Sequence, residues 1–275
     1  MPNTVLVVAN ETIGGRPLID AVLKRHEAGD ARFHLVVPRT RPKHGNIIYD
    51  EAVRDAAQVR VDLAVGYWSG EGIRGTGEVG DPDPFTATMD AIADVRPDEV
   101  IVSTHPLTSS GWLRRDLVER IRGETDVPVE HVVTDIEREG LPYTVTLVVA
   151  NKTADSDELL AKLRARAEND PARSFIVVVP QAGKEGGAAA EARKHLHAAL
   201  ERLRGAGMLA AGMIGDPDPY DATMNALQFY KVDEVVISTL GQVSSGWLRA
   251  DLVERVRKVS NLPVDHVMAS ETAKV

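Results

Sequence analysis

The sequence predicts an α/β protein made of two tandem domains, each a parallel β-sheet covered by helices on both faces. Two observations support this prediction. The second half of the chain repeats the first, and short apolar runs alternate with helical patterns within each half. A run of four or five consecutive apolar residues is typical of a strand that is buried on both faces. A chain of 275 residues is long enough for two domains that each have a core of their own.

The repeat is clearest toward the end of each half. Gly80–His131 aligns without gaps to Gly215–His266, and 29 of the 52 aligned positions are identical. The segment TVLVVAN, which ends at Asn10, also matches TLVVAN, which ends at Asn151. A period of this length is too long for a solenoid, so we interpret the two copies as duplicated domains.

The repeat also predicts where the domains begin and end. The apolar pattern breaks at residues 136–142, where a charged stretch ends in glycine. Such a break is typical of a connector between domains. We therefore expect one domain at residues 1–137 and a second at 143–275.

The pattern within each copy predicts five strands with helices between them. Proline follows the second apolar run and precedes the fifth, as expected where a strand ends or begins. Helical patterns fill the intervals, for example at Asp157–Glu168 and Ala188–Arg204. The expected strands are Val5–Ala9 and Leu147–Ala150, Phe33–Val37 and Phe175–Val179, a third that ends at Gly80 or Gly215, Glu99–Val102 and Glu234–Ile237, and Val129–Val133 and Val264–Met268.

Composition and charge exclude several classes of function. The net charge of −9 disfavours general nucleic-acid binding, which depends on neutralising phosphates with basic side chains. The chain has no cysteine, so disulfides, thiol nucleophiles and zinc-thiolate sites are excluded. No apolar run reaches the roughly 18–20 residues that a membrane span needs. We expect a cytoplasmic protein that does not bind membranes.

Candidate ligand-binding residues follow the first and fourth expected strands. In open parallel sheets, ligands bind beyond the carboxyl ends of the strands, where the strand order reverses. An amide and a hydroxyl after the first strand could hydrogen-bond a base or a ribose, or could form a turn that leads into a helix. Both alternatives stay open. The residues are Asn10 and Thr12, Asn151 and Thr153, and, after the fourth strand, Ser103 and Thr104, Ser238 and Thr239, and Gly241.

The loop that follows the fourth strand ends in SSGWLR in both copies. Free N–H groups at a helix start attract anions, and two hydroxyls, a glycine and an arginine suit phosphate oxygens. The alternative is that the serines only cap the helix, which is their commonest role at such a position. The residues concerned are Ser109, Ser110, Gly111 and Arg114 in the first copy, and Ser244, Ser245, Gly246 and Arg249 in the second.

Two other repeated features favour structural roles. The segment GDPDP occurs at 80–84 and 215–219 and resembles an acid pair, but Asp83 or Asp218 followed by proline is typical of a helix N-cap. His131 and His266 occupy equivalent strand positions with no triad pattern nearby, so we expect both to be structural. We predict no metal site and no catalytic residue.

The strand that ends in VVAN, GDP after the third strand, the DEV strand and DLVERV before the last strand resemble the universal stress protein domain. The resemblance covers both halves. It implies a sheet order of 3-2-1-4-5 and the adenine nucleotide alpha hydrolase-like fold class. Members typically dimerise through the fifth strand, so the resemblance implies that the two domains pair with each other, with a homodimer as a further possibility.

The resemblance also implies adenine nucleotide binding. Many members bind ATP through a glycine-rich loop after the fourth strand and an aspartate after the first, with backbone near Val36 or Val178 facing adenine. Here the aspartate is Asn10 or Asn151, and the first loop glycine is Ser103 or Ser238. The second glycine is Pro106 in the first copy and is kept as Gly241 in the second. We therefore expect the second copy to bind more tightly.

These observations lead to two functional hypotheses. The first is a stress-response protein that binds ATP, another adenine nucleotide or another phosphate-bearing anion at the carboxyl ends of the first and fourth strands. The second is an interaction or structural module that binds no nucleotide and forms an internal pseudo-dimer. We do not expect an enzyme, because no base, nucleophile or metal cluster accompanies the loop, although weak nucleotide hydrolysis stays an alternative.

Overall fold

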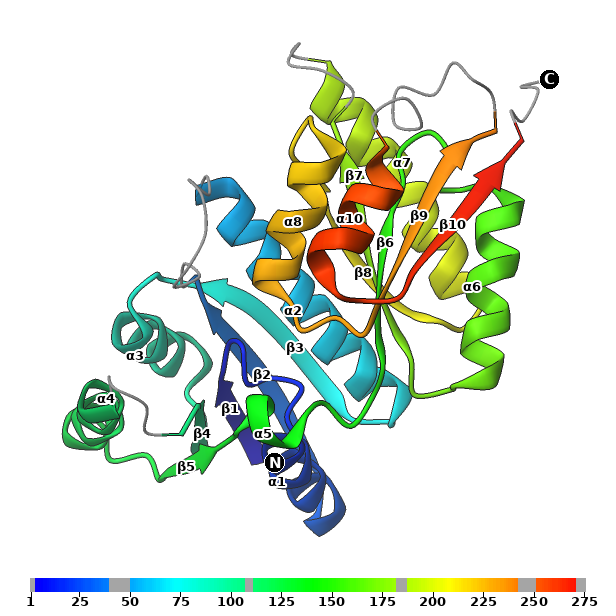
Figure 1. The fold of residues 1–275 in the computed structure, drawn as a ribbon. Coiled ribbons are helices and arrows are strands. Elements are labelled where there is room, and N and C mark those ends of the chain that lie inside the picture. The colour runs from blue at the N-terminus through cyan, green and yellow to red at the C-terminus, as the bar shows by residue number, and fades with distance from the viewer. Residues whose placement is uncertain (1–2, 40–49, 107–110, 182–186, 242–250, 271–275) are drawn as a thin grey trace. The chain divides into compact units, whose positions relative to one another are not determined.

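The computed structural model describes residues 3–39, 50–106, 111–181, 187–241 and 251–270 (Figure 1). Contacts divide the chain into two compact units. We call them unit 1, which is Met1–Arg41 with Arg60–Pro142, and unit 2, which is Pro42–Val59 with Tyr143–Val275. Each unit holds one five-stranded sheet. Residues 42–59 lie in the first repeat but group by contacts with unit 2.

Both sheets are parallel and have the strand order that the family resemblance implies. The order is β3-β2-β1-β4-β5 in unit 1 and, read in the same sense, β8-β7-β6-β9-β10 in unit 2. Every paired strand runs parallel to its neighbour. The predicted fold class is therefore confirmed. The strands are β1 (Asn3–Val8), β2 (Ala31–Pro38), β3 (Arg74–Gly80), β4 (Glu99–Thr104), β5 (Val129–Val133), β6 (Val145–Val149), β7 (Ser174–Pro180), β8 (Leu209–Gly215), β9 (Glu234–Leu240) and β10 (Val264–Ala269).

The helices lie between the strands, as the alternating pattern predicts. A short helix in the connector was not expected: Asp135 caps it by accepting a hydrogen bond from the Arg138 amide at 3.1 Å. No helix in the described ranges is long and apolar enough to cross a membrane. The helices are α1 (Arg16–Ala28), α2 (Asp50–Gly70), α3 (Pro84–Val95), α4 (Gly111–Glu124), α5 (Ile136–Glu139), α6 (Asp157–Asn169), α7 (Ala188–Gly205), α8 (Pro219–Phe229) and α10 (Leu252–Ser260).

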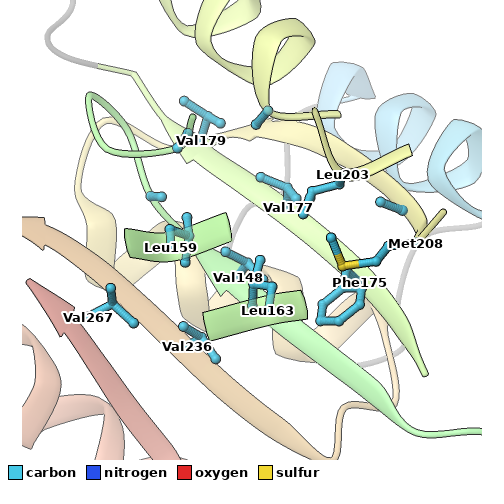
Figure 2. Close-up of a cluster of buried hydrophobic side chains, with 14 of the residues drawn as sticks. Val148, Leu159, Leu163, Phe175, Val177, Val179, Leu203, Met208, Val236 and Val267 are labelled. Atoms are coloured by element: carbon cyan, nitrogen blue, oxygen red, sulfur yellow. The ribbon is translucent and has the colours of Figure 1, made fainter. Parts of the chain in front are cut away.

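The core of unit 2 fills the space between one face of its sheet and helices α6 and α7 (Figure 2). Phe175 and Val177 project from alternate positions of β7 into this cluster and are fully buried. Leu159 and Leu163, one turn apart on α6, cover the same face. Because successive strand side chains point to opposite faces, the continuous apolar runs of β6 and β7 serve the helices on both sides. In unit 1 a buried cluster lies under α3 and α4, the counterparts of α8 and α10 rather than of α6 and α7.

Ion pairs link the amino ends of the strands to the last turns of the preceding helices. In unit 2, Arg166 of α6 bonds Glu234 at 2.9 Å and Asp265 at 2.8 Å. In unit 1, Arg25 of α1 makes the same two contacts, with Glu99 at 2.8 Å and Glu130 at 2.5 Å. The repeat therefore conserves a clamp at the opposite end of each sheet from the predicted ligand site.

This clamp predicts an acid-dependent loss of stability. Hydrogen bonds from Arg166 and Lys162 lower the pKa of Asp265 from 3.8 to about 2. A depressed folded-state pKa stabilises the protein at pH above 4, and this contribution disappears as the pH falls toward 2. Asp265→Asn should therefore lower the free energy of unfolding by about 1 kcal/mol at pH 6, since solvent screens this partly exposed pair. Urea titrations at pH 6, 4 and 2.5 should show that the difference in unfolding free energy between wild type and Asp265→Asn shrinks as the pH falls. A difference that does not change with pH would contradict this prediction.

Candidate functional site

The predicted site lies where the carboxyl ends of the first and fourth strands meet in each unit. These strands are adjacent and parallel in both sheets: β1 pairs with β4, and β6 pairs with β9. Their neighbours on the outer sides are β2 or β7 and β5 or β10, so the chain order reverses between them. The structure thus brings Thr12 close to Ser103, as expected for residues at such a reversal.

The asparagines after the first strands hold the ends of the second strands. The Nδ2 of Asn10 donates to the carbonyl of Pro38 at 3.0 Å, and that of Asn151 donates to Pro180 at 2.7 Å. These bonds use the amide nitrogens to hold a neighbouring strand, which neither of the two alternatives anticipated. In unit 2, the Nδ1 of His195 also lies 3.1 Å from the Asn151 Oδ1. Sequence reasoning did not identify His195, and its equivalent in the first copy is Arg60.

The backbone near the predicted adenine-facing position takes part in the same strand junction. The carbonyl of Val36 accepts a hydrogen bond from the Ala9 amide at 3.2 Å, and that of Val178 accepts one from Ala150 at 3.2 Å. Both valine side chains are fully buried. The first lone pair of each carbonyl is therefore used within the sheet, and only a second lone pair remains for a ligand.

In unit 1, the hydroxyls at the strand ends form a closed network. The Thr12 hydroxyl donates to the Ser103 carbonyl at 3.3 Å, and the Ser103 Oγ lies 3.2 Å from the Oγ1 of Thr134, which follows β5. The Thr134 amide donates to the Thr104 carbonyl at 2.8 Å. The hydroxyl of Thr104 lies 2.8 Å from the His131 Nε2. Each of these buried hydroxyls therefore has a partner within the unit.

In unit 2, the equivalent hydroxyls are not all satisfied. Thr153 is 3% exposed and Ser238 is 1% exposed, yet neither the Thr153 Oγ1 nor the Ser238 Oγ has a hydrogen-bond partner among the described residues. A buried hydroxyl without a partner costs about 1–3 kcal/mol. Thr239, by contrast, keeps its bond, with its Oγ1 2.8 Å from the His266 Nε2. The two units thus differ at the predicted site although their sheets have the same strand order.

The difference at Ser238, though not that at Thr153, is caused by a residue that the sequence analysis did not select. Thr134 bonds Ser103 in unit 1, but the residue that follows Val267 and Met268 at the same place in unit 2 is Ala269, which has no hydroxyl. The signal was present in the repeat alignment as one of two differences in the three positions that follow the matched histidines. Without the strand pairing, nothing indicated that this position touches Ser103 or Ser238.

Two histidines on the last strands each lie within hydrogen-bonding distance of a threonine, His131 of Thr104 and His266 of Thr239. Burial, and secondarily the charge of Arg122, lowers the pKa of His131. Burial and the charge of Arg257 likewise lower the pKa of His266, although Asp265 opposes this. In both imidazoles the lowered pKa favours the neutral form, which can still hydrogen-bond Thr104 or Thr239. In unit 2, a pocket of about 160 Å³ lies beside this pair, lined by Thr239, Asp251, Leu252, Val253, Glu254, Arg257 and His266.

The GDPDP segments cap helices, as predicted. The Asp83 carboxylate accepts from the Thr86 amide at 3.0 Å, and Asp218 accepts from the Tyr220 and Asp221 amides at 2.8 and 3.2 Å. A Cβ atom on Gly215 would lie 2.6 Å from the Ala222 Cβ, so glycine lets α8 approach the sheet. No group of three or more potential metal-ligating side chains occurs in the ranges that the structure describes.

The repeated loop is only partly within the described residues. Ser109 and Ser110 of the first copy, and Ser244, Ser245, Gly246 and Arg249 of the second, lie outside them. Gly111 begins α4, so the helix start predicted from SSGWLR is confirmed in unit 1, and Arg114 lies in the first turn of that helix. Gly241 follows β9, and its amide donates to the Ala269 carbonyl at 3.1 Å.

No protein-family model matches the chain, and a search of curated proteins gives no match. Solved structures similar to it include a universal stress protein from Archaeoglobus fulgidus, with 20% identity and a TM-score of 0.37 over 48% of this chain and 99% of that one. Another, from Archaeoglobus fulgidus DSM 4304, has 16% identity and a TM-score of 0.36 over 98% of this chain and 97% of that one. A functionally unknown protein from Pseudomonas aeruginosa PAO1 has 13% identity and a TM-score of 0.29 over 98% of this chain and 92% of that one. The chain is thus similar in structure to universal stress proteins.

Proposed function

We propose that this chain is a stress-response protein that binds ATP, another adenine nucleotide or another phosphate-bearing anion at the carboxyl ends of the first and fourth strands. The proposed domains are residues 1–137 and 143–275, and the site of the second domain is the stronger. Binding rather than catalysis is the proposed activity. The loop residues Ser244, Ser245 and Arg249 are proposed to supply further donors to the anion.

The observation that carries this proposal is the pair of buried hydroxyls on Thr153 and Ser238. Within the part of the chain that the structure describes, each lacks a hydrogen-bond partner, at the place where open parallel sheets bind ligands. Unit 1 supports the argument, because there the same fold gives the equivalent hydroxyls partners. A phosphate or ribose oxygen, or a water molecule held between the ligand and the protein, would give both hydroxyls of unit 2 an acceptor.

Substitution of Thr153 should separate binding from stability. Thr153→Val replaces the unpartnered hydroxyl by a methyl group of similar shape, so we expect the free energy of unfolding to rise by about 1 kcal/mol. The same change should weaken ATP binding about ten-fold, equivalent to about 1.4 kcal/mol. Isothermal titration calorimetry and urea unfolding measure the two effects.

The matched control is Thr12→Val in unit 1. Its hydroxyl already donates to the Ser103 carbonyl, so this variant should lose stability and leave ATP binding unchanged. A Thr153→Val chain that is destabilised and binds ATP as tightly as the wild type would contradict the proposal. Mass spectrometry of freshly purified, denatured protein should also detect a bound nucleotide. No heat with ATP, AMP or inorganic phosphate would refute nucleotide and anion binding.

The hydrogen-bond network among the strand-end hydroxyls of unit 1 favours a second function for that unit, that of an interaction or structural module. Since Thr12, Ser103 and Thr104 are all hydrogen-bonded within the unit, none needs a ligand to satisfy it. We therefore keep the interaction or structural module as the alternative, with unit 1 as its best example. If Arg249→Ala leaves both ATP binding and melting unchanged, the loop of unit 2 belongs to this alternative as well.

A further inference from the structure

Two positions far apart in the sequence differ between the units in a complementary way. Unit 1 has Gly15 before α1 and Thr134 after β5, whereas the aligned residues of unit 2 are Ser156 and Ala269. A Cβ atom on Gly15 would lie 1.9 Å from the Thr134 Cγ2. Threonine after the last strand therefore requires glycine before the first helix. In unit 2 the sizes are exchanged: the larger residue precedes the helix and the smaller one follows the strand.

The exchange changes hydrogen bonding as well as volume. In unit 1 the Thr134 hydroxyl occupies the position beside Ser103, at 3.2 Å, and Thr134 is fully buried. In unit 2 the Ser156 hydroxyl does not replace it: it accepts from the Leu159 amide at 3.3 Å as the N-cap of α6, and the Ser238 Oγ has no bond to it. Ser238 is consequently left without a partner among the described residues.

We infer that the chain binds one ligand, in unit 2 only, and that the exchanged pairs Gly15/Thr134 and Ser156/Ala269 determine which unit binds. This inference rests on the proposed function. Thr134 acts as an internal substitute for the ligand oxygen in unit 1 and satisfies Ser103 permanently. Ala269 has no hydroxyl to serve Ser238 in unit 2, so that a phosphate or ribose oxygen of the ligand, or its water, supplies the missing partner. Neither pair is proposed to touch the ligand through its own side chains; both act through Ser103 or Ser238.

Transplanting the pairs tests the inference. The variant Ser156→Gly/Ala269→Thr gives unit 2 the closed arrangement of unit 1, without the overlap that Ala269→Thr alone would cause. Loss of the serine cap is tolerable, since Gly15 caps α1 without any side-chain hydrogen bond and glycine is an accepted N-cap residue. The reciprocal variant, Gly15→Ser/Thr134→Ala, is the matched control in unit 1. Ala269→Ser supplies the hydroxyl without the threonine methyl and serves if the double variant fails to fold.

Calorimetry with ATP, and separately with inorganic phosphate, should give one site per wild-type chain. Ser156→Gly/Ala269→Thr and Ala269→Ser should each bind at least about ten-fold more weakly, while Gly15→Ser/Thr134→Ala retains the wild-type affinity of unit 2. Two equal sites per wild-type chain, or wild-type binding by folded Ser156→Gly/Ala269→Thr, would overturn the inference and leave the proposed function standing. A wild-type chain that binds neither probe would overturn both.

Discussion

Phe175→Ala is expected to lower the free energy of unfolding of unit 2 by about 3–5 kcal/mol. The Phe175 ring is fully buried in β7 and belongs to the cluster that includes Leu163, Leu203 and Met208 (Figure 2). Removing it takes away the largest side chain that β7 contributes to this cluster and leaves a cavity that two helices and a sheet cannot fill without moving.

Urea unfolding followed by circular dichroism measures this loss. Phe175→Leu keeps most of the volume and should cost less than about 1.5 kcal/mol. The repeat offers a further comparison in Phe33, which is 2% exposed and whose ring centroid lies 5.7 Å from that of Trp68. Phe33→Ala should destabilise unit 1 to a similar degree. A loss below about 1 kcal/mol for Phe175→Ala would mean that this core is not packed as described.

Glu234→Ala should destabilise unit 2 by about 3 kcal/mol, because it removes a carboxylate that two largely buried guanidinium groups share and leaves each of them one carboxylate, Asp265 or Asp170. Glu234 is bonded by Arg166 at 2.9 Å and by Arg173, and it also accepts from the Thr146 hydroxyl at 2.8 Å. The arginine side chains are only 17% and 14% exposed, so water replaces the lost bonds poorly.

The equivalent change in unit 1, Glu99→Ala, provides the control for this prediction. Among the described residues Glu99 pairs with one arginine, Arg25, which keeps its bond to Glu130. The expected loss is therefore smaller, about 1–2 kcal/mol. Thermal and urea unfolding of both variants at low and at 0.5 M salt would compare them. Equal losses in the two units would show that the second arginine in unit 2 contributes nothing.

The local features of the fold were predictable from the sequence because they depend on neighbours in the chain. Continuous apolar runs identified β1, β2, β6 and β7, and the helix caps at Asp83 and Asp218 followed from an aspartate that precedes proline. The parallel sheets followed from the alternation of strands and helices. Their order was implied by the family resemblance, and the structure confirms it.

The grouping of residues 50–59 with unit 2 was beyond the reach of the sequence. A helical pattern shows that a segment has an apolar stripe but not which part of the protein it packs against. The same limit applies to His195, whose contact with Asn151 joins a helix to a loop that is distant in the chain.

The sequence by itself determined that this chain is a duplicated α/β protein and that ligand-binding candidates follow the first and fourth strands. Those conclusions need only periodicity, repetition and the general behaviour of parallel sheets. Only the tertiary structure decided that the two copies differ at the site. The difference depends on whether Thr134 or Ala269, carried by the last strand, lies beside a serine on its neighbour. Such a hydrogen bond exists only once the strands are paired.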